Sequence, residues 1–217
     1  MKYKTILFDF DGTLVDSSRG ILECARYAMR EVGVAAPPEQ QLRKFIGPPL
    51  KISFMDVCGM DEEVAERAVM LYRERYAQTG ITEIDVYPGI EELLEELNEA
   101  GFLCAVASVK MEKIVRKSLN HLDMAGYFSA ICGASEDMNI NTKLHIIHDA
   151  VTRTSSRKKD CILVGDSSYD AEGALQAKVD FCAVLWGFGF GNMDEALQYP
   201  CRYVAADTGS LSRFLLR

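Results

Sequence analysis

The chain has 217 residues, of which 48% are hydrophobic, enough for one large α/β domain or a medium domain that carries an insertion. Its 24 basic residues against 32 acidic ones give a net charge of −8 at pH 7. Because nucleic-acid binding needs a basic footprint, this balance argues against a nucleic-acid partner. The overall field also repels an anionic substrate, which must therefore be held by local positive groups.

The cysteines and the apolar runs favour a cytoplasmic protein. Seven cysteines are scattered without a C-x-x-C pair, a pattern typical of reduced thiols rather than of a disulfide framework or a zinc site. No apolar run approaches the ~20 residues that cross a bilayer. The first apolar stretch meets Asp9 at once, unlike a signal peptide. We therefore expect a cytoplasmic location and no membrane partner.

Short apolar runs alternate with helical patterns along most of the chain. Turn or polar residues bound each of the runs that we predict to be buried strands: Thr5–Phe10, Phe102–Ala107, Cys161–Val164 and Phe181–Leu185. Between the first two, the apolar residues of Ile90–Leu97 recur at helical spacing after the Pro88-Gly89 turn. This alternation predicts a doubly wound, Rossmann-like α/β core, in which helices cover both faces of a parallel sheet.

One stretch, from about Ser17 to about Ile84, breaks the alternation. It contains helical patterns, among them Ile21–Val32 and a face over Val64–Tyr72 with Asp61 as its N-cap, and no convincing strand. An all-helical block between the first and second strands indicates an insertion, a small lid on the α/β core. We predict an α/β catalytic core of residues 1–15 and 86–217 and a helical cap of residues 16–85.

The first chemical signal is the run Asp9-Phe10-Asp11-Gly12-Thr13-Leu14, directly after the first strand. Ligands of open α/β sheets bind beyond the carboxyl ends of the strands, so both aspartates stand where a site is expected. One could attack a substrate or bind a metal, while the other exchanges a proton. The alternative is an Asx turn that ends the strand, with Gly12 supplying an unusual backbone angle.

A second acidic run, Gly165-Asp166-Ser167-Ser168-Tyr169-Asp170, follows the strand Cys161–Val164 in the same way. Because the ends of neighbouring parallel strands converge, Asp9 and Asp166 can face one another. Carboxylates this close repel, and Mg²⁺, which prefers a few carboxylates plus waters and a substrate phosphate, would resolve the repulsion. We therefore predict Mg²⁺ as the cofactor. The alternative is that Asp166 and Asp170 cap the following helix.

Two further residues are candidates for binding a phosphate. Ser108 ends a strand, and its hydroxyl, with the backbone N–H groups opening the next helix, would form an anion cradle. The alternative for Ser108 is an ordinary N-cap. Lys143 begins a helix that runs to Val151, where a cation is unfavourable for the helix dipole, which hints at another use. The alternative for Lys143 is a solvated surface position.

These four elements, in this order, resemble the haloacid dehalogenase superfamily of phosphatases and phosphotransferases, over essentially the whole chain. The resemblance implies that Asp9 is the nucleophile and a metal ligand. It implies that Asp11 is the general acid and base, with a backbone carbonyl that also binds the metal. Asp166 would complete the metal site, and Asp170 would orient a metal-bound water.

The same resemblance assigns the substrate contacts. Ser108 and Lys143 would bind the phosphoryl oxygens, and Lys143 would also neutralise the charge of the nucleophile. In the cap, Arg43 beside the Gly47-Pro48-Pro49 turn is the candidate for an anionic or polar substrate group, the alternative being a solvated arginine. The whole substrate site that we expect comprises Gly12, Thr13, Ser108, Val109, Lys143 and Arg43.

Finer features favour the phosphoglycolate phosphatase-like branch, and nucleotide phosphatases share them. These features are Gly12–Ser17, Phe45–Leu50 and Leu185–Gly189. Dehalogenases lack an acid at the position of Asp11, which favours phosphoryl chemistry. We predict a Mg²⁺-dependent phosphomonoester hydrolase that acts through an aspartyl-phosphate on a small phosphorylated metabolite of phosphoglycolate or nucleotide type. The alternatives are a phosphomutase, although mutase relatives usually carry a histidine near Ser17, and a non-catalytic binding protein on the same fold.

Overall fold

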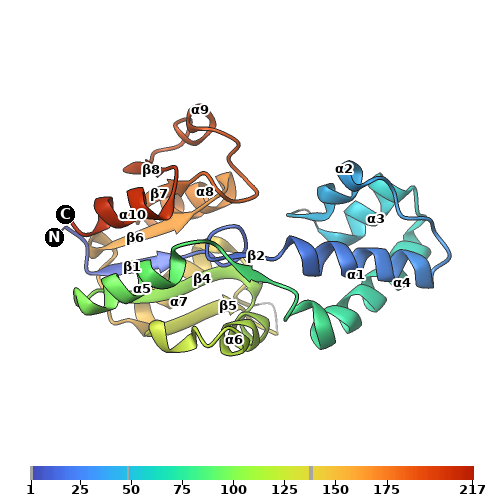
Figure 1. Cartoon of the computed structure of the whole chain (residues 1–217), viewed down its shortest axis with the longest axis horizontal. Helices are drawn as coiled ribbons and strands as arrows, with labels where there is room; N and C mark the ends of the chain where they lie inside the picture. Colours follow the sequence, from blue (N-terminus) through green and yellow to red (C-terminus); the bar gives the residue numbers. More distant parts are fainter. Residues whose placement is uncertain (1, 48, 137–138) are drawn as a thin grey trace. The chain divides into compact units, whose positions relative to one another are not determined.

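The computed structural model describes residues 2–47, 49–136 and 139–217 (Figure 1). The chain forms two compact units: a core unit, made of the residues up to Asp16 together with Val86–Arg217, and a helical unit, Ser17–Asp85. The short strands β2 (Val15–Asp16) and β3 (Asp85–Val86) stand where the chain passes between the units. Among the helices that the structure describes, none is long and apolar enough to cross a membrane.

The core unit is built on a six-stranded sheet, which is parallel as the sequence predicted and has two strands, β5 and β8, that were not predicted. Its order is β5-β4-β1-β6-β7-β8. The strands are β1 (Thr5–Phe8), β4 (Leu103–Met111), β5 (Ala130–Ala134), β6 (Cys161–Gly165), β7 (Asp180–Val184) and β8 (Tyr203–Ala205). Strand β1 pairs with β4 on one side and β6 on the other, so the chain winds outward from β1 in both directions. The place where the winding direction changes is the reversal point of the sheet. In such sheets ligands bind there, beyond the carboxyl ends of the strands.

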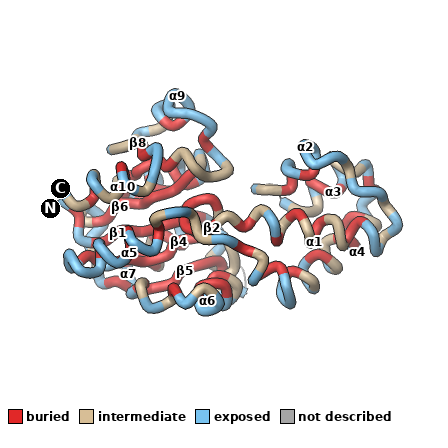
Figure 2. The backbone as a smooth tube through the Cα atoms, viewed as in Figure 1, coloured by how far each residue is buried: buried red, intermediate tan, exposed pale blue. Residues whose placement is uncertain are grey.

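Helices cover both faces of this sheet. They are α5 (Ile90–Glu99), α6 (Glu112–His121), α7 (Lys143–Arg153), α8 (Ser168–Ala177), α9 (Met193–Ala196) and α10 (Thr208–Leu215). Helices α7 and α8 pack on each other and on the central strands, and α5 packs with α10. Leu7 and Leu163 of the sheet share a buried cluster with Ile146 and Ile147 of α7. Figure 2 shows the central strands as the most continuously buried part of this unit.

The helical unit consists of α1 (Ser18–Glu31), α2 (Glu39–Leu42), α3 (Leu50–Cys58) and α4 (Glu62–Arg75), with short 3₁₀ and π turns at Arg43–Phe45 (η1) and Tyr76–Gly80 (η2). Leu22, Met29 and Phe54 are buried in it. Asp61 caps α4 by accepting a hydrogen bond from the Val64 N–H at 2.9 Å, as predicted. Within the Gly47-Pro48-Pro49 turn, Pro48 lies outside the described residues.

Candidate active site

Three strand ends bring the predicted core residues together at the reversal point of the sheet. Asp9 directly follows β1, and its N–H donates to the Val164 carbonyl of β6 at 2.9 Å. Asp166 directly follows β6, and Ser108 lies near the end of β4. Because β4 and β6 flank β1, their carboxyl ends meet on either side of Asp9.

Three carboxylates form a buried acidic cluster here. Asp9, Asp166 and Asp170 each place a carboxylate oxygen within 4.8 Å of the others. They are 8%, 3% and 0% exposed. Three buried negative charges at this separation repel one another strongly unless protons or cations compensate them.

Lys143 supplies one compensating charge from the first turn of α7. Its Nζ lies 2.8 Å from Asp9 Oδ1 and 2.7 Å from Asp170 Oδ1, and it donates to the Ala107 carbonyl at 2.8 Å. Lys143 is 2% exposed, so the surface alternative is wrong. Burial disfavours its charged form, but the two carboxylates outweigh burial and raise the pKa of Lys143. Gly173 makes room for it, because a Cβ there would stand 2.3 Å from Lys143 Cγ.

One lysine does not balance three carboxylates, and the pKa values of Asp9 and Asp166 are raised. Burial raises the pKa of Asp9 to about 7, despite the opposing charge of Lys143. Burial and the neighbouring Asp170 raise the pKa of Asp166 to about 6. The cluster offers only hard oxygen donors, and a divalent cation would remove the excess negative charge. These residues therefore fit Mg²⁺.

The glycine-rich loop after β7 holds Asp166 in place. Asp166 Oδ2 accepts from the N–H groups of Phe188 at 2.8 Å and Gly189 at 3.0 Å, and Oδ1 accepts from the Thr13 hydroxyl at 3.2 Å. A Cβ on Gly187 would stand 2.4 Å from Asp166 Cβ, so this close approach requires glycine. Sequence reasoning named this loop but missed its contact with Asp166, for which the Gly187-Phe188-Gly189 spacing was the available signal.

Asp170 combines the two interpretations that the sequence left open. Its Oδ2 accepts from the Ser167 N–H at 3.1 Å and the Ser167 hydroxyl at 2.6 Å, which completes a capping box at the start of α8. Its Oδ1 faces Lys143. Asp170 therefore caps the helix and belongs to the buried cluster. Asp166 has no capping role, because Ser167 is the N-cap.

Asp11 lies outside the acidic cluster and has a partner that sequence reasoning missed. Lys110 Nζ donates to both Asp11 oxygens, at 2.8 and 3.0 Å. Ser108 is 1% exposed, and its hydroxyl accepts weakly from the Lys110 N–H at 3.4 Å. The expectation that a helix opens directly after Ser108 is wrong, since β4 continues to Met111 and Met111 is the N-cap of α6. The N-cap alternative for Ser108 is therefore also wrong.

The remaining predicted substrate residues lie in the turn after β1, in β4 and in the helical unit. The N–H groups of Gly12 and Thr13 are bonded within their turn, to the carbonyls of Val15 at 2.9 Å and Phe10 at 3.4 Å. Gly12 has φ +80°, the unusual angle that the Asx-turn alternative required. Val109 is 41% exposed, and Arg43 is exposed at the start of η1 in the helical unit.

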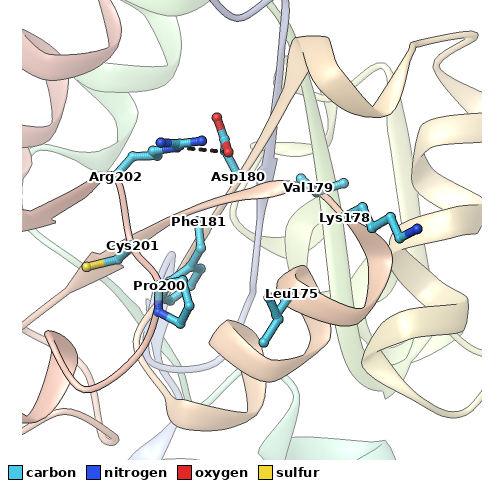
Figure 3. Close-up of a pocket in the computed structure, with 8 residues that line it drawn as sticks. All are labelled: Leu175, Lys178, Val179, Asp180, Phe181, Pro200, Cys201 and Arg202. Atoms are coloured by element: carbon cyan, nitrogen blue, oxygen red, sulfur yellow. Dashed lines mark ion pairs between the residues drawn. The ribbon is translucent and has the colours of Figure 1, made fainter.

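A hollow of about 440 Å³ lies elsewhere, at the amino ends of β7 and β8 (Figure 3). Its lining includes Phe181, Pro200 and Arg202, and Arg202 pairs with Asp180 at 2.9 Å. None of the predicted site residues lines it. The chemistry of the cluster, and not the size of this hollow, therefore identifies the candidate active site.

Comparison with known proteins agrees with this geometry. The model of the haloacid dehalogenase-like hydrolase family matches residues 6–184. The chain belongs to this family. It is an enzyme of the phosphatase class, and the predicted family and fold are confirmed.

Three similar proteins illustrate the range of the family. A 5'-nucleotidase from Pseudomonas aeruginosa is 35% identical over 99% of this chain and 96% of its own. The tyrosine-protein kinase PtkA of Mycobacterium tuberculosis is 34% identical over 85% of this chain and 62% of its own. The crystal structure of a predicted phosphatase from Clostridium acetobutylicum is 36% identical, with a TM-score of 0.86 over 100% of this chain and 99% of that one. Phosphoglycolate phosphatases and pyrophosphatases also match.

Proposed function

We propose that this phosphatase is a Mg²⁺-dependent phosphomonoester hydrolase that transfers the phosphoryl group first to Asp9 and then to water. The observation that carries the proposal is the buried cluster of Asp9, Asp166 and Asp170, in which the ammonium of Lys143 pairs with Asp9 and Asp170. Attack of a carboxylate on an anionic phosphoryl group is favoured by nearby cations, which Lys143 and a metal shared by the acidic residues would supply.

The first step forms an acyl phosphate. An Asp9 carboxylate oxygen attacks the phosphorus, the bond to the ester oxygen breaks, and Asp11 gives its proton to the departing alcohol oxygen. Lys143 stabilises the negative charge on the phosphoryl oxygens beside Asp9. Ser108 lies at the adjacent strand end and would donate its hydroxyl to the same oxygens, with the exposed Val109 beside it.

The second step releases phosphate. Asp11, now a carboxylate, takes a proton from water as the water oxygen attacks phosphorus, and the bond to Asp9 breaks. This regenerates the carboxylate of Asp9 and the protonated Asp11, so protons and bonds balance over the cycle.

Asp9, Asp166 and the backbone carbonyl of Asp11 would hold the Mg²⁺. When bound, the ion neutralises the carboxylates and stabilises the charge that develops on the phosphoryl group. Asp170 would orient a water of the ion while it fixes Lys143. Thr13 acts through its hydrogen bond to Asp166, and Gly12 through its close approach to the same carboxylate.

For the substrate, we propose a small phosphorylated metabolite of nucleotide or phosphoglycolate type, which the relatives with those activities support. We propose that residues 16–85 act as a cap over a core of residues 1–15 and 86–217, with Arg43 contacting the alcohol half. The net charge of −8 argues against a nucleic-acid partner, and the scattered cysteines support a cytoplasmic location.

A panel of phosphate esters tests the proposal. Nucleoside 5'-monophosphates, 2-phosphoglycolate, sugar phosphates and phosphotyrosine are each incubated with the chain in Mg²⁺ and in EDTA, and free phosphate is measured. We expect release from at least one class of small ester in Mg²⁺ and none in EDTA. Isomerised sugar phosphate without free phosphate would instead indicate the phosphomutase, and full activity in EDTA would contradict the metal assignment.

A further inference from the structure

Lys110 holds the acid of the proposed reaction through both of its oxygens. The Nζ–Oδ distances to Asp11 are 2.8 and 3.0 Å, and the side chains of Lys110 and Asp11 are 14% and 27% exposed. The ammonium also lies 5.6 Å from the centre of the Phe10 ring. Both residues stand in the core unit, beside the strand ends that carry Asp9 and Ser108.

An irregularity at the end of β4 aims Lys110 at Asp11. The pairing of β4 with β5 shifts register between Ala107 and Met111. Lys110 lies within this irregular stretch, because β4 continues to Met111. Gly133 of β5 permits the irregular course, since a Cβ there would stand 2.5 Å from the Lys110 carbonyl oxygen. Bulges beside active sites commonly re-aim a side chain in this way.

The two lysines of the site differ in what they can offer a substrate. Lys143 has three protons and three protein acceptors, namely Asp9, Asp170 and the Ala107 carbonyl. Lys110 donates to both oxygens of Asp11, the residue that exchanges a proton with the leaving alcohol in the proposed reaction. While Asp11 holds the proton that it will give to the alcohol, it is neutral and pairs less strongly with Lys110, so a negative group on that alcohol can take its place on the ammonium.

We propose that Lys110 determines specificity by exchanging Asp11 for an anionic group on the leaving alcohol. The enzyme then favours phosphate esters whose alcohol half carries a second negative charge close to the ester oxygen, such as a carboxylate. This inference rests on the proposed function, in which Asp11 is the acid. A protein of net charge −8 repels such substrates, so a local cation is needed to accept them.

A matched pair of esters tests the exchange. 2-Phosphoglycolate carries a carboxylate at the position where 2-hydroxyethyl phosphate carries an uncharged hydroxymethyl group. We measure kcat and KM for both with the unmodified chain, Lys110→Met, Lys110→Arg and the control Lys113→Met, which removes an exposed lysine paired with Glu136. Melting temperatures verify that each variant folds.

We expect the unmodified chain and Lys113→Met to prefer the anionic ester by about tenfold or more in kcat/KM. Lys110→Met should remove most of that preference, chiefly by raising KM for the anionic ester, and Lys110→Arg should keep part of it. Equal loss for both esters, or no preference in the unmodified chain, would overturn the exchange while leaving the proposed hydrolysis intact. If Lys110→Met does not fold, loss of the preference in Lys110→Gln decides the question. Undiminished hydrolysis by Asp9→Asn would instead contradict the proposed function itself.

Discussion

Gly12 lies so close to Asp166 that a Cβ built on Gly12 would stand 2.4 Å from Asp166 Oδ2. Gly12 also has φ +80°, a backbone conformation that side chains disfavour. The turn after β1 and the end of β6 are therefore fitted to each other at the carboxylate that we propose as a metal ligand. Any side chain at Gly12 must displace that carboxylate.

Gly12→Ala should consequently raise the Mg²⁺ concentration needed for half-maximal activity, by about tenfold or more if the carboxylate loses its position. Gly101→Ala is the matched control, because Gly101 has φ +82° and a Cβ on it would meet nothing within 4 Å. Both variants should lose about 1–2 kcal/mol of stability through backbone strain. Mg²⁺ titrations of activity, with urea unfolding of each variant, measure the two effects. An unchanged Mg²⁺ requirement in a folded Gly12→Ala variant would contradict the role of Asp166.

The convergence of Asp9 and Asp166 could be predicted from the sequence, because both follow buried runs and parallel strands end at one edge of a sheet. The burial of Lys143 could not. A lysine at a helix start gave a hint, but its environment depends on Gly173, which lies on a different helix and leaves room for the lysine stem. Side-chain burial of this kind is decided by packing between elements, which periodicity along one element does not report.

Other features escaped prediction because their signals are weak. Strand β5 is a short run with Gly133 inside it, and β8 has only three residues, Tyr203–Ala205. The irregular end of β4 hid Lys110, since regular alternation gives no reason to aim it at Asp11. The fold class was predictable from the four stronger strands, whereas the partner of Asp11 depended on the irregular end of β4 and the backbone partners of Asp166 depended on loop geometry.

The acidic cluster predicts a pH-dependent response to Mg²⁺. A carboxyl group whose folded pKa is raised stabilises the fold below its unfolded value of 3.8, and loses that contribution as the pH rises through its folded value. For Asp9 and Asp166 those folded pKa values are about 7 and about 6. The metal-free protein therefore loses stability from these groups between about pH 4 and pH 7.

Mg²⁺ binds the deprotonated cluster and should raise the melting temperature more at about pH 8 than at about pH 5. The comparison with and without Mg²⁺ at each pH cancels the titration of distant surface groups. Asp166→Asn should remove most of the Mg²⁺-induced rise at both pH values. An equal rise in melting temperature at both pH values would contradict the assignment of these carboxylates as the ligands.

Arg43 allows a test of the proposal that the core unit carries out the chemistry while the helical unit helps to select the substrate. The residues assigned to the chemistry all belong to the core unit, whereas Arg43 is exposed in the helical unit. Arg43→Ala should therefore change the ranking of substrates, mainly through KM, and affect p-nitrophenyl phosphate little. Arg67→Ala, which removes another exposed arginine of the helical unit, is the control and should keep the ranking. An equal fall in kcat for every ester would assign Arg43 to the common chemistry instead.

The central claim is that Asp9 is the nucleophile, and phosphate release by Asp9→Asn tests it most directly. Asparagine keeps the size of the side chain but cannot form the acyl phosphate, so we expect the rate in saturating Mg²⁺ to fall by about three orders of magnitude or more. The melting profile should show that the variant remains folded. A rate within about tenfold of the unmodified chain, with that profile unchanged, would contradict the account.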